Sequence, residues 1–397
     1  MYWLRQTVAV LFLNLRTIPA RLGSSAVAII GIAGVVIVFV SVLSISAGFA
    51  AAMKGSGSTE RAIIMRSGVD TELTSGIEGP EIRIIKEAPG IKRDGDTAFE
   101  SADFYAIIEL PKKTSPETTA NVPIRGIEPA GLKVREEVSL VEGRMFRFGS
   151  NEVIVGRATH NLFVGLNVGD TVISGQNRWV VVGVFEADGG VAETEIWCDV
   201  QALQSGYRRP NWFNSVLVTL ESPDSFERLQ EWLKANPQTQ TVDVRRESEY
   251  YAGQSEQMTR LINTLGFGIA TLMAIGAVFG AILTMYTAVA SRAREIATLR
   301  ALGFNAVSVV VSVLAESVIL GAIGGSIGAI AAYLAFDGFQ TSTMNWQSFS
   351  QVAFAFKVTP ALFATGLLYA LAIGFIGGLL PAIRAARLPI SRALREL

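Results

Sequence analysis

The chain has 397 residues, of which 50% are hydrophobic and 17% are charged, with a mean hydropathy of +0.39 and a net charge of −1. Its single cysteine, Cys198, excludes an internal disulfide. Its single histidine, His160, argues against a histidine-rich metal or haem site. This composition indicates a membrane protein whose polar part relies on its own hydrophobic core.

Four segments are long and apolar enough to cross a membrane as helices: 24–53, 261–291, 307–336 and 359–380. A helix needs about 20 apolar residues to cross a hydrocarbon layer of about 30 Å. Glu316 is the one charged residue within these four segments. A helix that is apolar on all sides has no face to offer water, so the sequence predicts four transmembrane helices.

The first segment allows an alternative, because basic residues precede it and small residues end it, as in a secretory signal peptide. The apolar core of a signal peptide has about 7 to 15 residues. Segment 24–53 is longer than that, so we favour a retained transmembrane helix.

Charge is distributed unevenly along the chain. Residues 54–259 hold 22 Lys or Arg against 31 Asp or Glu, a formal charge of −9, whereas the N-terminal segment 1–23, the turn 292–306 and the tail 381–397 are basic. Lys and Arg accumulate in the cytoplasmic parts of membrane proteins. The sequence therefore predicts that both termini and the turn are cytoplasmic, and that the acidic segment and the loop 337–358 lie outside.

The outer segment 54–260 mixes helical and strand patterns. A short helical pattern near Ile82 is followed by the strand-like run FYAIIEL, and Ser222 caps a second predicted helix that ends before Pro237. Near 150–200, β-branched runs separated by Gly-containing turns predict a β-rich subdomain. The predicted fold is an α-helical membrane domain of four transmembrane helices with a large α+β extracytoplasmic domain inserted between helices 1 and 2.

Motifs for catalysis are scarce. The sequence has no Gly-Lys pair and hence no phosphate-binding P-loop, so this chain is not its own ATPase of that type. The GxSxG match at 324–328 lies in a predicted crossing instead of a strand-to-helix turn, and we interpret it as chance. We predict no catalytic residue and no metal site, and expect a non-enzymatic subunit.

The turn SRAREIATLRALGFNA, 291–306, separates two predicted crossings. Ile296, Leu299 and Leu302 recur at steps of three residues and Gly303 supplies a stop, which predicts a short amphipathic helix at the cytoplasmic surface. The alternative is a helix that lies among the lipid headgroups with its arginines on phosphates.

This turn also carries a family resemblance. The run R-x-R-E-I-x-x-L-R-A-L-G, the next crossing with Glu316 and the series GAIGGSIG resemble the permease subunits of the MacB, FtsX and LolC type of ABC system. The tail PAIRAARLPISRALREL and the outer runs PIRGIEP, EGRMFRFGSNEVIVG, VGDTV and VVVGVF are similar to the same family. The resemblance covers nearly the whole chain.

The resemblance implies a multi-pass permease of the inner (plasma) membrane that pairs as a homodimer or with a paralogous permease. A separate ABC ATPase subunit would bind ATP and magnesium, and this chain would hold no cofactor. The permease would act by mechanotransmission, which relays motion of the ATPase to the outer domain for export or extraction of a substrate. A periplasmic adaptor protein and membrane lipid are further candidate partners, and no nucleic acid is expected.

The resemblance also assigns residues to ATPase coupling: Arg292, Arg294, Glu295, Ile296, Leu299, Arg300 and Gly303 match the coupling-helix motif or lie beside it. The arginines and Glu295 suit charge-assisted contacts to a partner protein. Ile296 and Leu299 suit insertion into an apolar groove between ATPase lobes.

Polar and small residues within the crossings form a second set of candidates. Glu316 is costly inside a membrane, and we favour a hydrogen-bonding role between helices over a proton relay. Glycines spaced for close helix packing are Gly276, Gly280, Gly321, Gly324, Gly325, Gly328, Gly374 and Gly378. Such glycines suit a dimer of four-helix units, and packing within one chain explains them almost as well.

Two other functions remain as alternatives. An FtsX-like transmembrane regulator would use the same machinery to activate an extracytoplasmic partner such as a cell-wall hydrolase. A secondary transporter driven by an ion gradient is disfavoured, because four crossings with one buried charge offer little for ion coupling.

Overall fold

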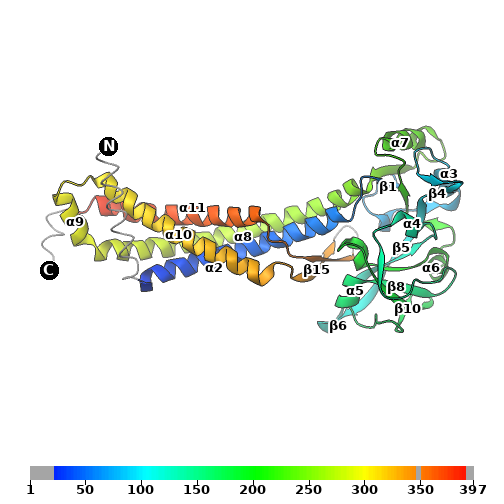
Figure 1. Ribbon diagram of the computed structural model, residues 1–397, viewed down its shortest axis with the longest axis horizontal. Coiled ribbons are helices and arrows are strands. Elements are labelled where there is room, and N and C mark those ends of the chain that lie inside the picture. Colours follow the sequence, from blue (N-terminus) through cyan, green and yellow to red (C-terminus); the bar gives the residue numbers. More distant parts are fainter. Residues whose placement is uncertain (1–21, 346–349, 390–397) are drawn as a thin grey trace. The chain divides into compact units, whose positions relative to one another are not determined.

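The computed structural model describes residues 22–345 and 350–389 (Figure 1). The chain divides into two compact units, which are described separately here. One, the helical unit, comprises the chain up to Ala47 together with Leu261–Phe339 and the segment from Phe356 onwards. The other, the inserted domain, comprises Gly48–Arg260 and Gln340–Ala355.

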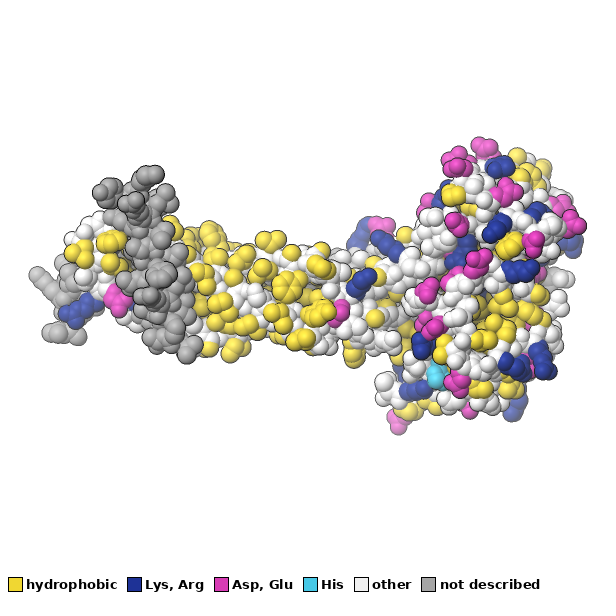
Figure 2. Space-filling model, in the orientation of Figure 1, with side chains coloured by type: hydrophobic (Ala, Val, Ile, Leu, Met, Phe, Trp, Pro, Cys, Tyr) yellow, Lys and Arg dark blue, Asp and Glu magenta, His cyan; other side chains and the backbone are white. Residues whose placement is uncertain are grey.

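Four long apolar helices occur among the described residues: α2 (Leu22–Gly55), α8 (Glu247–Ser291), α10 (Ala306–Phe336) and α11 (Pro360–Ala386). Each has the length and composition of a membrane-spanning helix. Figure 2 shows hydrophobic side chains over most of the visible face of the helical unit. Apolar surface of this kind is stable in lipid and unstable in water, so these helices make the chain a multi-pass membrane protein.

The core of the helical unit forms where small residues let α2, α10 and α11 approach closely. Ile32 and Val36 of α2 pack with Ala332 of α10 and with Ala370 and Ile373 of α11. Figure 1 shows α10 and α11 side by side along much of their length. Without a hydrophobic driving force in lipid, such helices associate through van der Waals contact, which small side chains favour.

Two helices extend beyond the predicted crossings. Helix α8 begins at Glu247, well before residue 261, because its first turns are amphipathic and bury Tyr250 and Met258 in the inserted domain. Helix α11 continues through Pro381 to Ala386, and the buried Ala382 and Ala385 hold its last turns in a core cluster of the helical unit. Both ends continue the helices, but their hydropathy is too low to indicate a membrane crossing.

The inserted domain is built on one ten-stranded sheet in the order β14-β1-β13-β5-β6-β11-β8-β10-β7, with β9 paired to β10. Its strands are β1 (Arg61–Arg66), β5 (Glu100–Lys112), β6 (Ser115–Ile127), β7 (Ser139–Gly143), β8 (Glu152–Gly156), β9 (Thr171–Ser174), β10 (Asn177–Glu186), β11 (Ile196–Asp199), β13 (Ser215–Thr219) and β14 (Val242–Arg246). The pairs β8–β10 and β6–β11 are parallel, and the other pairs are antiparallel.

Shorter elements cover or connect the sheet. The helices are α3 (Gly79–Lys86), α4 (Gly131–Val134), α5 (Arg157–Leu162), α6 (Val200–Gly206) and α7 (Ser225–Ala235), with 3-10 turns η2 (Glu72–Thr74) and η3 (Val191–Thr194). Two small ribbons pair β2 (Ile77–Glu78) with β12 (Trp212–Phe213) and β3 (Arg93–Asp94) with β4 (Thr97–Ala98).

The two ends of the inserted segment share a core. Strand β1 pairs with both β13 and β14, and Ile64, Val218 and Val244 pack with Leu229 of α7 in one cluster. Helix α7 begins at Ser225 instead of next to the predicted cap Ser222, whose Oγ lies 3.0 Å from the Oγ of Ser225. The residue before the helix is Asp224, and Pro223 lies outside it.

The middle of the insertion has its own core, around Trp179, Phe163 and Val155. The two cores share one sheet, because β5 pairs with β13 on one side and with β6 on the other. Strand β5 contributes Ala102 to the first core and Phe104 to the second. The predicted fold class, four apolar helices with an α+β domain inserted between the first two, is confirmed.

The segment treated as a loop in the sequence, 337–358, contains a β-hairpin of β15 (Gln340–Asn345) and β16 (Ser350–Ala355). The hairpin belongs to the inserted domain, although it lies between α10 and α11 in sequence. Phe354 packs edge-on against Phe49 at 5.6 Å between ring centroids, and Asn345 Nδ2 donates to Gln254 Oε1 at 3.0 Å.

Candidate functional site

A short helix, α9 (Ala293–Ala301), connects α8 and α10 in the turn for which the sequence predicts an amphipathic helix. The chain leaves it through Gly303, whose φ is +93°. This left-handed conformation favours glycine, because a Cβ would clash with the backbone. Glycine at this position therefore lets the chain turn from α9 into α10.

Arg292, at the start of α9, is paired with Glu316 of α10. The Arg292 Nη1 and Nη2 atoms donate to the two Glu316 carboxylate oxygens at 3.0 and 3.2 Å. Both side chains are 5% exposed. Arg292 is therefore a hydrogen-bond partner of Glu316, for which we favour a hydrogen-bonding role between helices. The Arg292 side chain points into the helical unit and is not available to an ATPase.

The remaining residues of α9 divide between two faces. Ile296 is buried with Val309 and Met285 in a core cluster, so its predicted insertion into a partner groove is incompatible with its position. Arg294 and Glu295 are exposed, and Leu299 is half-buried. The surface that α9 offers to a partner is therefore smaller and more polar than its sequence indicates.

Arg300 fixes the other end of α9. Its Nη1 donates to the carbonyl oxygens of Ala386 and Leu388, at 2.8 and 2.9 Å. The Ala386 carbonyl belongs to the last residue of α11 and the Leu388 carbonyl lies two residues beyond it, at the end where the helix dipole attracts cations. Arg292 and Arg300 thus hold α9 against α10 and the end of α11, respectively.

Six of the eight candidate glycines lie at close contacts between helices. A Cβ on Gly324 or Gly328 would come within 2.8 Å of backbone oxygens of α2, and one on Gly321 or Gly374 within 2.8 Å of the partner helix in the α10–α11 pair. Gly325 and Gly378 meet side chains of the same pair, Ala370 and Ser317 respectively. Packing within one chain therefore accounts for these six.

Gly276 and Gly280 of α8 differ from the others. A Cβ at either position would meet no described atom within 4 Å. Their role in helix packing within the chain is not supported, and they lie on a face of α8 that the described residues leave open.

The inserted domain contains a charged cluster that the sequence analysis missed. Arg125 of β6 donates five hydrogen bonds to Glu72, Asp103 and Glu195, at 2.7 to 3.0 Å. Burial alone would raise the pKa of Glu72, but the charge and hydrogen bonds of Arg125 hold it below its usual value. The one available signal was an arginine inside the strand-like run NVPIRGI, where an unpaired charge is not tolerated.

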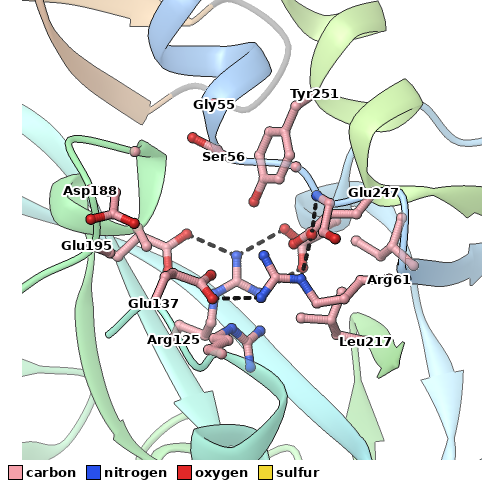
Figure 3. Close-up of a pocket in the computed structure, with 18 of the residues that line it drawn as sticks. Gly55, Ser56, Arg61, Arg125, Glu137, Asp188, Glu195, Leu217, Glu247 and Tyr251 are labelled. Carbon is pink, nitrogen blue, oxygen red and sulfur yellow. Dashed lines mark hydrogen bonds and ion pairs between the residues drawn. The ribbon is translucent and has the colours of Figure 1, made fainter. Parts of the chain in front are cut away.

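A second arginine, Arg61, joins the ends of α2 and α8 within the inserted domain. Its Nε donates to Glu247, the first residue of α8, at 2.6 Å, and its Nη1 donates to Glu137 at 2.7 Å. The backbone N–H of Ser58, just after α2, donates to the same Glu247 oxygen at 2.9 Å. Figure 3 shows Arg61, Glu137 and Glu247 together beside a cavity.

Four long apolar helices with a folded insertion and a tethered helix between two of them define a multi-pass membrane protein with one large inserted domain. The MacB-like periplasmic core domain model matches residues 25–236, and the FtsX-like permease C-terminal model matches residues 267–390. Because the first match spans more than half of the chain, the chain belongs to the MacB/FtsX-type family of ABC transporter permeases.

Among its relatives is an uncharacterized ABC transporter permease of Methanocaldococcus jannaschii, 22% identical over 61% of this chain and 61% of that protein. Another is the macrolide export ATP-binding/permease protein MacB 1/2 of Paracoccus denitrificans, 26% identical over 70% of this chain and 42% of that protein. The chain thus matches less than two thirds of the length of either relative.

A solved structure is also among the matches. The periplasmic region of MacB from Actinobacillus actinomycetemcomitans aligns with 51% of this chain and 96% of its own, at 15% identity and a TM-score of 0.38.

Proposed function

We propose that the chain is the permease subunit of an ABC transporter and works with a separate ATPase by mechanotransmission. ATP and magnesium would bind to the ATPase, and motion there would be relayed through α9 to the helical unit and the inserted domain. By the charge distribution of the sequence, α9 and both termini would lie in the cytoplasm. Two permease chains, identical or paralogous, would assemble with two ATPase subunits.

The observation that carries this proposal is the double tether of α9. Arg292 pairs with Glu316 of α10, and Arg300 binds the last carbonyl of α11 and that of Leu388 just beyond it. A surface helix whose only task was to lie among lipid headgroups would direct its arginines to phosphates. Here two arginines bind groups of the neighbouring helical segments instead. A push on α9 would therefore move α10 and α11 with it.

The exposed residues of α9 supply the contact to the ATPase. Arg294 and Glu295 are exposed on one helix turn and present opposite charges, which suits charge-assisted hydrogen bonds to a partner. Leu302 is 73% exposed just after the helix and suits a small apolar pocket. Arg294, Glu295 and Leu302 therefore replace Arg292 and Ile296 as the proposed contact residues.

The transported substrate would be exported or extracted without the need to pass through the helical unit. Macrolide export is named for the MacB relatives, and export of a small molecule is our proposal for this chain as well. In such a system the inserted domain would meet the substrate or a periplasmic adaptor.

The test is purification of the tagged full-length chain from its native membrane, with identification of proteins retained in stoichiometric amount. We expect an ABC ATPase whose hydrolysis is stimulated by the permease. The variant Arg294→Glu should lose most of this stimulation and keep its unfolding temperature, because the side chain is exposed. Arg147→Glu, the same change at an exposed site of the inserted domain, is the matched control.

Absence of an ATPase, even with a non-hydrolysable nucleotide, would contradict the proposal. If the Arg294→Glu permease still stimulated ATP hydrolysis fully, α9 would not be the surface that contacts the ATPase. A copurifying extracytoplasmic hydrolase would instead support the regulatory alternative.

A further inference from the structure

The end of α11 carries two exposed arginines that the proposed coupling does not use, Arg384 and Arg387. They are three positions apart, so their side chains are neighbours on the helix surface. Among the described residues, neither forms an ion pair or a side-chain hydrogen bond. Segments 292–306 and 381–389 hold five arginines and one acid, Glu295. This end of the helical unit therefore has an excess of positive charge.

Tyr286 of α8 orients one of these arginines. The Arg384 guanidinium lies 5.2 Å from the centre of the Tyr286 ring. Helices α8 and α11 are close nearby, because a Cβ on Gly377 would come within 2.7 Å of the Ala281 Cβ. A guanidinium over an aromatic face keeps its N–H groups at the edge, where they can donate. The ring thus holds Arg384 in place without using its hydrogen-bond donors.

Arg384 lies where an apolar surface ends. At about 1.5 Å per residue, it is about 36 Å along α11 from Pro360, and the hydrocarbon layer is about 30 Å thick. A helix that spans this layer from Pro360 therefore brings Arg384 to the headgroups. Ile376 and Leu380, two turns and one turn earlier, are each 54% exposed, and Phe279 of α8 is 63% exposed. This surface suits the acyl chains of a lipid.

The end of α11 is also prepared for a negative charge. The C-terminus of a helix carries a partial negative charge, which would repel an anion. Here Arg300 of α9 donates to the carbonyl oxygens of Ala386 and Leu388 at 2.8 and 2.9 Å. Figure 1 shows the end of α11, in red, beside α9. The bound guanidinium offsets the charge of these carbonyls.

We propose that Arg384 and Arg387 bind the headgroup of an anionic phospholipid, whose acyl chains lie along the exposed apolar sides of α8 and α11. Arginine donates two parallel hydrogen bonds to a phosphate group. A zwitterionic headgroup fits less well, because its cationic end is repelled by the two guanidinium groups. The bound lipid would hold the end of α11, to which Arg300 tethers α9. The inference is independent of the ATPase coupling.

The test measures thermal unfolding of the full-length chain, purified in a neutral maltoside detergent and stripped of native lipid, as phospholipid is added in mixed micelles. Phosphatidylglycerol is anionic, and phosphatidylcholine with the same acyl chains is zwitterionic. We expect a saturable rise in unfolding temperature, with half of the effect reached at an at least about threefold lower concentration of phosphatidylglycerol. Glycerol phosphate has no acyl chains and should give no such rise.

Three variants link the preference to the arginines. Arg384→Gln and Arg387→Gln each remove one charge, and we expect each to weaken phosphatidylglycerol binding about 3- to 10-fold, with less effect on phosphatidylcholine. Arg294→Gln removes the same charge from an exposed position of α9 and is the matched control. This control should keep the preference for phosphatidylglycerol.

Tyr286 provides a second comparison. Tyr286→Phe keeps an aromatic ring under Arg384 and should bind phosphatidylglycerol as wild type does. Tyr286→Leu removes the ring, and we expect binding about threefold weaker. A role of Tyr286 in packing alone would change the unfolding temperature without lipid and leave the half-maximal lipid concentration unchanged.

The inference is overturned if both phospholipids act at the same concentration, or if glycerol phosphate produces the same rise. Equal weakening by Arg294→Gln and Arg384→Gln would also overturn it, because positive charge anywhere on this end would then suffice. Should Arg384→Gln fail to fold, Arg387→Gln and the two Tyr286 variants still decide.

Discussion

Arg292 and Glu316 are 24 positions apart in sequence and form a bidentate ion pair inside the helical unit. Both are almost fully buried. An isolated buried charge costs far more than a buried pair, so each residue depends on the other for its presence in this environment. The pair joins the helix proposed to meet the ATPase to a helix of the membrane core.

We predict strong coupling between these two residues in a double-mutant cycle. Arg292→Met or Glu316→Leu alone should destabilise the chain by about 3–5 kcal/mol, because each removes one half of a buried ion pair and leaves the other charge buried. The double variant Arg292→Met/Glu316→Leu should lose much less. Unfolding temperatures in detergent provide the measurement, and additive losses would show that the pair does not act as a unit.

The glycines of α10 should differ sharply from those of α8. Gly328→Val places a Cβ 2.6 Å from the Ala33 carbonyl oxygen, so we expect a loss of about 1–3 kcal/mol from overpacking. A Cβ at Gly276 would meet no described atom of another element within 4 Å, so Gly276→Val should change the unfolding temperature of a single chain much less. If instead Gly276→Val separates paired chains in a sizing experiment, the open face of α8 is where two copies meet.

Glu100 should make the inserted domain less stable as the pH rises. Burial, together with the charge of Glu128, raises the pKa of Glu100 from 4.5 to about 7. Between these two values the folded state binds more protons than the unfolded state, so stability is greatest at low pH and is lost as the pH rises through 7. Glu100→Gln should unfold at a higher temperature than wild type at pH 8, with little difference at pH 5. An equal difference at both values would refute the assignment.

Arg125 should not tolerate lysine. The guanidinium binds Glu72 and Glu195 through both oxygens of each carboxylate, and a single ammonium cannot reproduce this geometry. We expect Arg125→Lys to lower the unfolding temperature of the full-length chain markedly. Arg157→Lys, in the exposed pair with Glu186, is the control and should change it little. Similar effects of the two substitutions would mean that the cluster contributes no more than a surface ion pair.

The sequence was sufficient for the architecture, because hydropathy and helix length depend on local composition. The four apolar helices and the inserted α+β domain follow from runs of residues that are adjacent in the chain. Element ends were less accurate, as with α7, where Asp224 and not Ser222 precedes the helix. Ser222, Asp224 and Ser225 are all cap-type residues within four positions, and Asp224 makes no side-chain cap hydrogen bond, so the sequence pattern alone does not identify the first helical residue.

The site was predicted less completely, because its contacts join distant segments. No local pattern shows that Arg292 faces Glu316, or that Arg125 gathers three acids from η2, β5 and the segment before β11. The amphipathic pattern of α9 predicts an apolar side, but it does not show whether that side faces a partner or the rest of the chain. Ile296 is therefore predicted to contact a partner, whereas in the structure it lies in the core. The pairing of α9 with an ATPase stays a prediction.

The β15–β16 hairpin affects how the inserted domain can be studied. Val352 and Phe354 of the hairpin are buried against the domain, at 1% and 5% exposure, although they follow α10 in the chain. A soluble fragment cut at residues 54 and 260 would lack both the hairpin and Phe49, and would expose an apolar patch that the intact protein covers. Proteins captured with such a fragment would report on the cut surface, so partner searches call for the whole chain.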